Sequence, residues 1–449
     1  MNEVETALEK YRKIFSLIKE HHEWLKRSIP LIASENVTSP AVREALTCDF
    51  GHRYAEGWPG ERVYAGCKYM DAVEVMAMEM AKQLFRAEYV DVRPISGVNA
   101  NLIAYTAFTE PGDRIMALSI PCGGHITTAR KALWGTAGAV HGLKVQYYPY
   151  DEEALNIDVD ETIKKVRKLE KEGKHVNLFV LGASVFPFPH PVKEISELAA
   201  EYGAKVMYDA AHVAGLIAGG QFQDPLREGA DVMTMSTHKT LFGPQRGMIA
   251  SWEKYAETLK KATFPANLSN HHLHTLAGLA VALAEFTAFG REYAAQVIKN
   301  AQALGQALYE RGFKVLGEEQ GFTKSHVLLI DIVDTPLKDG MQVEKALERA
   351  NIIVNRNLLP WDIRKGRHYM APGGIRIGTS EVTRLGMKES EMEAIAEFMK
   401  RVVIDLEDPE KVGRDVAEFR AEYQKCHYCF EDMADAHEYL ELRYGRRVG

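Results

Sequence analysis

"DVMTMSTHKTLFGP", residues 231–244, places a single lysine, Lys239, directly after a short apolar run and before Gly243-Pro244. The run "MTMS" predicts a buried strand, and the Gly-Pro pair predicts the turn that follows it. In open α/β sheets, ligands bind beyond the carboxyl ends of the strands. A lysine that only met solvent would need no such setting, so the stretch predicts that the Lys239 amine faces a ligand.

The same pattern extends outward on both sides. From about residue 89 to 252, apolar runs such as "NLFVLG" and "KVMYD" alternate with helical patterns such as "VKEISELAAEYG". This alternation predicts α/β layering around a largely parallel sheet. A long helical region near 272–313 follows, and later runs such as "HVLLIDI" predict a smaller α+β domain. We expect a helical arm over 1–35, a large α/β domain over 36–300 and a small domain over 301–449.

The bulk composition excludes several classes of protein. The 449 residues are 46% hydrophobic and 26% charged with a net charge of −7, which is an ordinary globular composition without a basic tract. We therefore expect neither nucleic acid nor a membrane surface as a partner. The sequence shows neither a signal-peptide pattern nor a run of 18 apolar residues, so it predicts a cytoplasmic protein.

Five cysteines in a chain of this length do not make a disulfide framework. Cys426 and Cys429 in "KCHYCF" have CxxC spacing, but a zinc site usually needs a second such pair. We therefore predict no metal site and an ordinary C-terminal helix there.

Polar side chains follow the predicted strands at the points where they end. They are Ser184, Asp209, His212, Ser236, His238 and Lys239. Ser96-Gly97 precedes an apparent helix start, where backbone N–H groups and the helix dipole favour a phosphate. In "IPCGGHITT", His125 follows two glycines that would let a ring lie close to the backbone.

A lysine, an aspartate and a phosphate-binding helix start are the groups that a pyridoxal phosphate enzyme needs. Lys239 would form a Schiff base with the cofactor aldehyde, and Asp209 would keep the pyridine nitrogen protonated. Each residue alone has an ordinary alternative, since a lysine after a strand is commonly solvated and an aspartate there commonly caps a helix. Their joint occurrence in this order favours pyridoxal phosphate binding.

Several motifs make the chain similar to the serine hydroxymethyltransferase family. In chain order these are "LIASENVTSP", "RYAEGWPGERVYAGCKYMD", "ISGVNAN", "CGGH", "DAAHVAGLIAGG", "STHKTLFGP" and "GGIRIGTSEVTR". "FPFPHPVKE", "SNHHLH" and "NLLPWD" look most like the archaeal branch of the family. The resemblance implies the aspartate-aminotransferase fold (fold type I), with a seven-stranded, mainly parallel sheet and a smaller α+β domain.

The resemblance also implies roles at the matching positions. Lys239 would carry the cofactor, Asp209 would pair with the pyridinium nitrogen, and His125 would stack on the ring. The phosphate end would be lined by Ser96, Gly97, Val98, Ser236 and His238, with Ser184 and His212 near the phenolic oxygen and the substrate. Arg376, close to Ser34, would bind the substrate carboxylate, since its planar fork can make two parallel hydrogen bonds.

Three residues of "RYAEGWPGERVY" would reach into the neighbouring subunit by this resemblance. They are Tyr54, Glu56 and Tyr64, and they imply a homodimer or tetramer with shared active sites. Glu56 is the candidate for proton transfer at the serine hydroxyl, which requires a carboxyl group that can hold a proton. On the sequence alone, Glu56 is an ordinary loop carboxylate.

The family's pterin contacts correspond to Ile120, Gly124, Ile126 and Asn357. We therefore expect a glycine hydroxymethyltransferase that interconverts serine and glycine and passes the hydroxymethyl carbon to a reduced pterin of the folate or methanopterin type. The alternatives are a related β-hydroxy amino acid aldolase or transaldolase, an α-methylserine hydroxymethyltransferase, an aminotransferase, or a non-catalytic protein of the same fold.

Some positions depart from the family pattern. Val98 replaces a hydroxyl residue in the phosphate loop, and Val63 replaces a tyrosine near the pterin. "FPANLSNHH" replaces a glycine-rich loop, so Ser269 and Asn270 would take over its contact with the phosphate. "ASVFPF" follows a different course after Ser184, and "GPQRG" adds one residue after the lysine segment.

Overall fold

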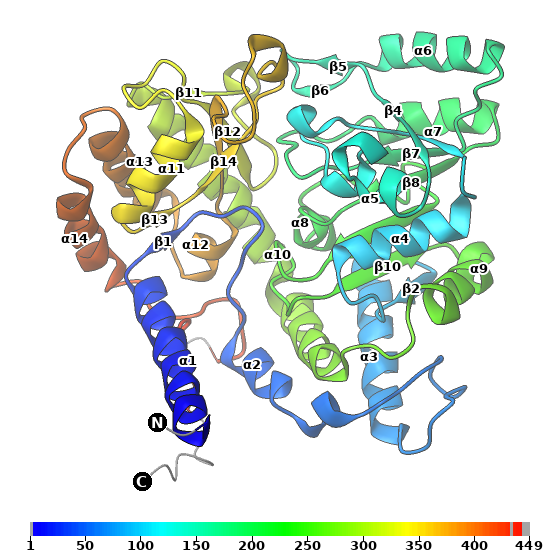
Figure 1. Ribbon diagram of the computed structural model, residues 1–449, viewed down its shortest axis with the longest axis horizontal. Coiled ribbons are helices and arrows are strands. Elements are labelled where there is room, and N and C mark those ends of the chain that lie inside the picture. The colour runs from blue at the N-terminus through cyan, green and yellow to red at the C-terminus, as the bar shows by residue number, and fades with distance from the viewer. Residues whose placement is uncertain (1–2, 432–433, 442–449) are drawn as a thin grey trace.

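The computed structural model describes residues 3–431 and 434–441, and its centre is a seven-stranded sheet (Figure 1). The strand order is β2-β10-β9-β8-β7-β3-β4. The strands are β2 (Tyr89–Asp91), β10 (Gly247–Ser251), β9 (Val232–Ser236), β8 (Lys205–Asp209), β7 (Leu178–Leu181), β3 (Arg114–Ala117) and β4 (Lys144–Tyr147). Strand β10 runs antiparallel to β2 and β9, and the other pairs are parallel. The predicted mainly parallel sheet of fold type I is confirmed.

The strands are apolar on both faces because helices cover both faces. On β8, Val206 and Tyr208 face one core and Met207 faces the other. The first core contains residues of α3 (Lys68–Phe85), α6 (Val159–Lys171), α7 (Val192–Glu201), α8 (Ala214–Ala218) and α10 (Leu273–Glu310). The second contains residues of α4 (Gly97–Phe108), α5 (Thr136–Ala139) and α9 (Ala256–Lys261). With both faces covered, ligands can reach the sheet only at its strand ends.

A second, four-stranded antiparallel sheet has the order β11-β12-β15-β14. Its strands are β11 (Lys314–Val315), β12 (Val327–Asp331), β15 (Gly374–Gly378) and β14 (Asn355–Asn357). It shares a core with α11 (Gly340–Arg349), α13 (Glu389–Val403) and α14 (Pro409–Arg420). Shorter elements include α2 (Pro40–Leu46), α12 (Ser380–Arg384), β5 (Tyr150–Asp151) and β6 (Asn156–Ile157).

Helix α10 joins the two sheets, as Figure 1 shows. Its first part packs in the core of the large sheet, and Leu304, Ala307 and Leu308 near its end belong to the core of the small one. By length and composition this helix could cross a membrane, but half of its most apolar window is buried inside the protein. The packing identifies it as a core helix, and a domain division near residue 300 stays our proposal.

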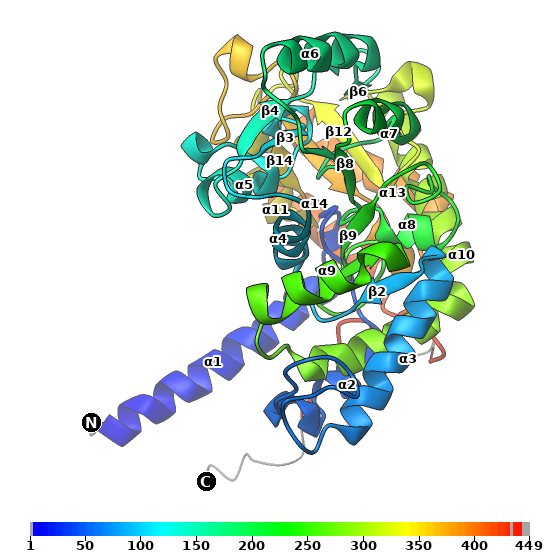
Figure 2. The same ribbon diagram turned by 90° about the vertical axis from the view of Figure 1, so that its right-hand side faces the viewer.

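The N-terminal arm is helix α1 (Glu3–Lys26), which has no buried residue and projects from the body of the molecule (Figure 2). Strand β1 (Ile29–Pro30) follows and pairs in parallel with β13 (Ile352–Ile353) of the small domain. The loop after β1 then passes to the large domain, so residues near Ser34 lie where the two domains meet.

Candidate active site

A cavity of about 180 Å³ lies beyond the ends of β7, β8 and β9. It contains ten of the residues predicted from the sequence: Ser96, Gly97, Val98, His125, Ser184, Asp209, His212, Ser236, His238 and Lys239. Asn101, Ala183 and Ala211 complete the lining. Strand β8 ends at Asp209 and β9 ends at Ser236, so parallel strands bring distant parts of the sequence to one edge of the sheet.

The start of α4 forms one wall of the cavity. Ser96 caps this helix, and its hydroxyl accepts a hydrogen bond from the Asn99 amide at 3.1 Å. A Cβ atom on Gly97 would lie 2.6 Å from the Ser236 hydroxyl, so only glycine lets the helix start approach β9 this closely. The backbone N–H groups and dipole of a 12-residue helix therefore favour an anion at this wall.

Asp209 is held by hydrogen bonds to both carboxylate oxygens. Asn101 Nδ2 donates to Oδ2 at 2.8 Å, and the Ala211 amide donates to Oδ1 at 3.0 Å. Asn101 is itself fixed, because its Oδ1 accepts from the Thr234 hydroxyl at 2.6 Å. All of these side chains are buried, so the carboxylate has one orientation in the cavity.

The His125 ring is oriented by Thr127. The Thr127 amide donates to His125 Nδ1 at 3.2 Å, and the Thr127 hydroxyl lies 2.8 Å from the same nitrogen. Asn101 Nδ2 donates to that hydroxyl at 3.0 Å, so one asparagine supports both His125 and Asp209. Burial lowers the pKa of His125, and the nearby Asp209 opposes the shift.

The "ASVFPF" departure has a structural consequence beside His125. The amides of Ser184 and Val185 both donate to the Gly123 carbonyl, at 2.8 Å and 3.2 Å. Gly123 has a φ of 93°, and a Cβ there would lie 2.0 Å from the Val185 carbonyl oxygen. The chain after Ser184 therefore packs directly against the turn that leads to His125.

The Lys239 side chain is buried in this cavity. Burial lowers its pKa from 10.5 to about 8, with Asp209 opposing the shift and Arg376 adding to it. The backbone around it is also fixed, since Asn36 Nδ2 donates to the Lys239 carbonyl at 2.7 Å. About a tenth of this amine is therefore neutral at pH 7, far more than for an ordinary lysine, as a nucleophilic lysine requires.

Arg376, on β15, brings the small domain to the same site. Its Nη1 donates to the Ser184 carbonyl at 3.0 Å, and its Nε donates to Asn355 Oδ1 at 3.1 Å. Burial lowers its pKa to about 10, so the guanidinium stays positive at neutral pH. A buried, positively charged guanidinium group beside Ser184 is suited to bind a carboxylate ligand.

Two comparisons with known proteins bear on this geometry. Residues 8–399 match the family model described as serine hydroxymethyltransferase. The chain belongs to the serine hydroxymethyltransferase family. It is 58% identical to a serine hydroxymethyltransferase of Nitrosopumilus maritimus over 435 residues, which covers 97% of this chain and 98% of the relative.

Two further archaeal relatives carry the same name. The relative from Methanocaldococcus jannaschii is 55% identical over 94% of this chain and 96% of its own length. The relative from Pyrococcus abyssi is 51% identical over 95% of this chain and 98% of its own length. The predicted family and its archaeal character are confirmed, and the protein is a pyridoxal phosphate-dependent transferase.

Five residues that the family resemblance assigned to a shared site lie outside the cavity that contains Lys239. They are Tyr54, Glu56, Tyr64, Ser269 and Asn270. These five are near one another: the Tyr54 and Tyr64 rings are 4.9 Å apart, and the Tyr54 hydroxyl is 3.4 Å from the Ser269 hydroxyl. Ser34 lines a separate pocket that shares only His238 with the cavity.

The residues expected to contact a pterin also lie outside the cavity lining. Ile120 and Ile126 each begin a short 3₁₀ turn, Ile120–Cys122 and Ile126–Thr128, on either side of Gly124. Asn357 is on β14, and its Nδ2 donates to the Leu358 carbonyl at 2.7 Å. Ile120, Gly124 and Ile126 lie in the segment that carries His125, whereas Asn357 lies beside β15, the strand of Arg376. The role of all four in pterin binding stays a prediction.

Sequence reasoning missed three residues that support the site. Asn101 and Thr127 hold Asp209 and His125, and His326 stacks on His212 with ring centroids 5.7 Å apart. His326 Nε2 is 3.0 Å from the Ala33 carbonyl, so this stack joins the two domains. Asn101 could have been found, because it lies in the "ISGVNAN" motif five residues after Ser96.

The CxxC pair lies away from the cavity. Cys426 and Cys429 are buried in a small apolar cluster with Val37, Leu385 and Ala436. They lie in an irregular segment after α14, so the helix predicted there is wrong. Across residues 3–431 and 434–441, no three His, Cys, Asp or Glu side chains form a group that could hold a metal ion.

Proposed function

We propose that this transferase interconverts L-serine and glycine and passes the hydroxymethyl carbon to a reduced pterin. The observation that carries the proposal is the cavity in which Lys239, Asp209 and the start of α4 meet. Relatives at 51–58% identity over nearly the whole chain carry the same enzyme name. The reduced pterin is the expected carbon acceptor.

The cavity residues fit pyridoxal phosphate. The amine of Lys239 is buried with a pKa of about 8, Asp209 presents a fixed carboxylate, and the helix start at Ser96 favours a phosphate. When bound, this cofactor supplies a ring that accepts the electrons of a breaking bond at the substrate Cα. Lys239 would hold the cofactor through its aldehyde, and Asp209 would keep the proton on the pyridine nitrogen.

The other residues would bind and orient the substrate. Arg376 would pair with the serine carboxylate, because its guanidinium is buried and positive beside Ser184. His125, held by Thr127, would lie against the cofactor ring, and the buried neutral His212 would lie near the substrate. Burial of these groups would exclude water from the reacting carbon.

Glu56 would move the proton at the serine hydroxyl, and it would do so in the neighbouring subunit of a homodimer. This arrangement is supported by the position of Tyr54, Glu56 and Tyr64 outside the cavity of their own chain. General acid–base catalysis contributes roughly 10²- to 10⁴-fold, so a Glu56→Gln variant should keep the cofactor and lose serine cleavage by that factor. Full cleavage by this variant would contradict the role.

The decisive experiment measures serine cleavage with tetrahydrofolate, with tetrahydromethanopterin and without either. Glycine formation that depends on one of the two identifies the carbon carrier. The same assay with threonine and α-methylserine separates the proposed activity from the related aldolase and α-methylserine reactions. Cleavage of serine that neither pterin accelerates would sink the transferase proposal.

A further inference from the structure

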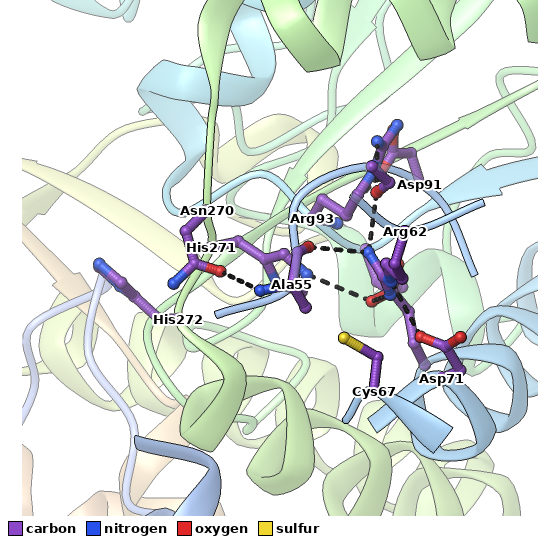
Figure 3. Close-up of polar contacts among 12 residues, drawn as sticks. Ala55, Arg62, Cys67, Asp71, Asp91, Arg93, Asn270, His271 and His272 are labelled. Carbon is purple, nitrogen blue, oxygen red and sulfur yellow. Dashed lines mark hydrogen bonds and ion pairs between the residues drawn. The ribbon is translucent and has the colours of Figure 1, made fainter. Parts of the chain in front are cut away.

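A continuous set of buried polar groups, three of them charged, lies behind the loop that carries Glu56. It consists of Arg62, Glu74, His271 and Arg246, whose side chains are all nearly inaccessible to solvent. These residues come from the loop, α3, the segment before α10 and the position just before β10. Figure 3 shows Arg62 and His271 of this buried ion network, with Ala55, Asp71 and Asn270 around them.

The Arg62 guanidinium holds the backbone on both sides of Glu56. Its Nη1 donates to the Ala55 carbonyl at 2.9 Å and to the Gly57 carbonyl at 2.8 Å (Figure 3 draws the first). Its other nitrogens are used by carboxylates, since Nε donates to Asp71 at 2.8 Å and Nη2 donates to Glu74 at 2.6 Å. A lysine could not make this pattern, because only the planar fork of arginine offers donors in these directions.

Glu74 is fully buried and joins Arg62 to His271. Its Oε2 lies 3.2 Å from His271 Nε2. Arg246 Nη2 lies 3.0 Å from His271 Nδ1, and an arginine can only donate, so Nδ1 accepts and Nε2 carries the proton toward Glu74. Burial alone would raise the pKa of Glu74, but His271 and Arg62 outweigh burial and lower it.

Arg246 connects this network to the strand that leads to Lys239. It is fully buried and donates to the Val92 carbonyl at 2.6 Å and the Thr275 hydroxyl at 2.8 Å. Its own carbonyl accepts from the Thr237 amide at 3.0 Å, two residues before Lys239. Arg246 is the arginine of "GPQRG", so the segment with the added residue supplies this buried contact.

A second set of bonds fixes the same loop from its other side. Asn270 Oδ1 accepts from the Ala55 amide at 2.9 Å, and Asn270 Nδ2 donates to the Arg53 carbonyl at 3.2 Å. The Glu56 carbonyl accepts from the Val63 amide at 3.2 Å. The carbonyls of Ala55, Glu56 and Gly57 and the Ala55 amide are thus all hydrogen-bonded. The Glu56 side chain is half-buried and not part of the network.

We infer that Arg62, Glu74 and His271 are positioning residues that give the Glu56 carboxyl group one orientation for proton transfer at the serine hydroxyl. The inference rests on the proposed function of Glu56 and adds the residues through which its geometry is set. A displacement of a catalytic group by about 1 Å can cost on the order of a hundredfold in rate, so a network that holds the flanking peptides matters to catalysis.

The test is Arg62→Lys in the enzyme loaded with its cofactor. We expect kcat for pterin-dependent serine cleavage to fall at least about tenfold, while KM for serine changes less than about twofold. Exchange of the glycine α-proton with solvent should keep its rate, because glycine has no hydroxyl group for Glu56 to serve. Arg311→Lys is the matched control, since Arg311 also joins two carboxylates and a carbonyl, but in the small domain.

A double variant separates positioning from a general loss of structure. If Arg62 acts through Glu56, Arg62→Lys should slow a Glu56→Gln enzyme by less than about twofold. Hydrogen exchange of the amides of residues 55–63 should be faster in Arg62→Lys, with or without cofactor. The inference would be overturned if the two substitutions reduced kcat independently, so that their effects multiplied in the double variant. It would also be overturned if the amides of residues 55–63 exchanged at the wild-type rate in Arg62→Lys.

Glu74→Gln is a second variant that tests the same inference if Arg62→Lys does not fold. It removes the charge but leaves an acceptor for Arg62, so a loss of kcat with unchanged glycine exchange is expected again. An unchanged kcat in both variants would refute the positioning role alone. Full activity of Glu56→Gln would instead refute the proposed role of Glu56, and the positioning role with it.

Discussion

The cofactor cavity and the Glu56 loop are built in opposite ways. The cavity lies at strand ends of one sheet, and its groups are fixed mainly by hydrogen bonds such as those of Asn101 and Thr127. The loop is irregular and is fixed by buried charges, with Arg62 and Glu74 at its centre. The difference indicates that sheet topology can form a binding cavity, whereas a group proposed for catalysis on a loop needs its own buried support.

The largest effect is expected for the cavity's central residue. Lys239→Arg keeps the charge, but arginine does not lose its proton in proteins and cannot act as the nucleophile. We expect loss of the cofactor absorbance near the visible edge and a fall in serine cleavage of at least about a thousandfold. The exposed Lys164→Arg is the control, and a normal absorbance band in Lys239→Arg would disprove the assignment.

Mixing two inactive variants tests whether the loop serves the cavity of its own chain or that of a neighbour. In a hybrid dimer of Lys239→Arg and Glu56→Gln subunits, one cavity would receive an intact Lys239 and the neighbour's intact Glu56. Random reassociation should therefore restore about a quarter of the wild-type sites, measured as kcat per subunit. No recovery, with hybrids verified by mass, would place both groups in one chain.

The pH dependence of cofactor binding should separate the two regions further. The pKa of Lys239 is lowered from 10.5 to about 8, so the neutral fraction of the amine rises as pH increases toward 8 and then levels off. The rate at which the apoenzyme captures pyridoxal phosphate should rise roughly fiftyfold between about pH 6 and pH 8. Glu56→Gln should follow the same curve. A rise that continues to pH 10 would contradict the buried setting of the amine.

A smaller effect on cofactor binding is expected for Asn101, which supports both Asp209 and His125. Asn101→Leu removes one buried hydrogen-bond partner each from Asp209 and from the hydroxyls of Thr127 and Thr234, which should cost about 1–3 kcal/mol in the free energy of unfolding. It should also weaken cofactor binding in an absorbance titration. Asn300→Leu is the control, because Asn300 donates to Thr383 and Met387 in the core between α10 and the small domain. It should destabilise the protein without changing cofactor affinity.

The smallest effect is expected at the start of α4, the wall of the cavity that favours an anion. Val98 lines the cavity in place of a hydroxyl residue, and a hydrogen bond is worth about 1 kcal/mol. Val98→Ser should therefore bind pyridoxal phosphate roughly fivefold more tightly. An equilibrium titration of the apoenzyme measures this, and weaker binding by the variant would show that the valine contributes a favourable contact instead.

Most of the cavity could be predicted from the sequence because its residues stand at recognisable local positions. Lys239, Asp209 and Ser184 follow apolar runs, and Ser96-Gly97 precedes a helix, so each position is visible within about ten residues of sequence. The parallel sheet then brings all of these positions to one edge. The support by Asn101 and Thr127 was missed, because hydrogen bonds between helix, loop and strand leave no periodic pattern.

The sequence by itself determined which apolar runs form strands, which chemical groups follow them and the family to which the chain belongs. Only the tertiary structure decided which charged and polar residues are buried together. Glu74 and His271 are nearly two hundred residues apart along the chain, yet their side chains are 3.2 Å apart. The added residue of "GPQRG" was unexplained by local rules, and its neighbour Arg246 proves to be the buried link beside them. Burial of a charge depends on partners from the whole fold, because each ion is stable in the interior only where opposite charges and donors meet it.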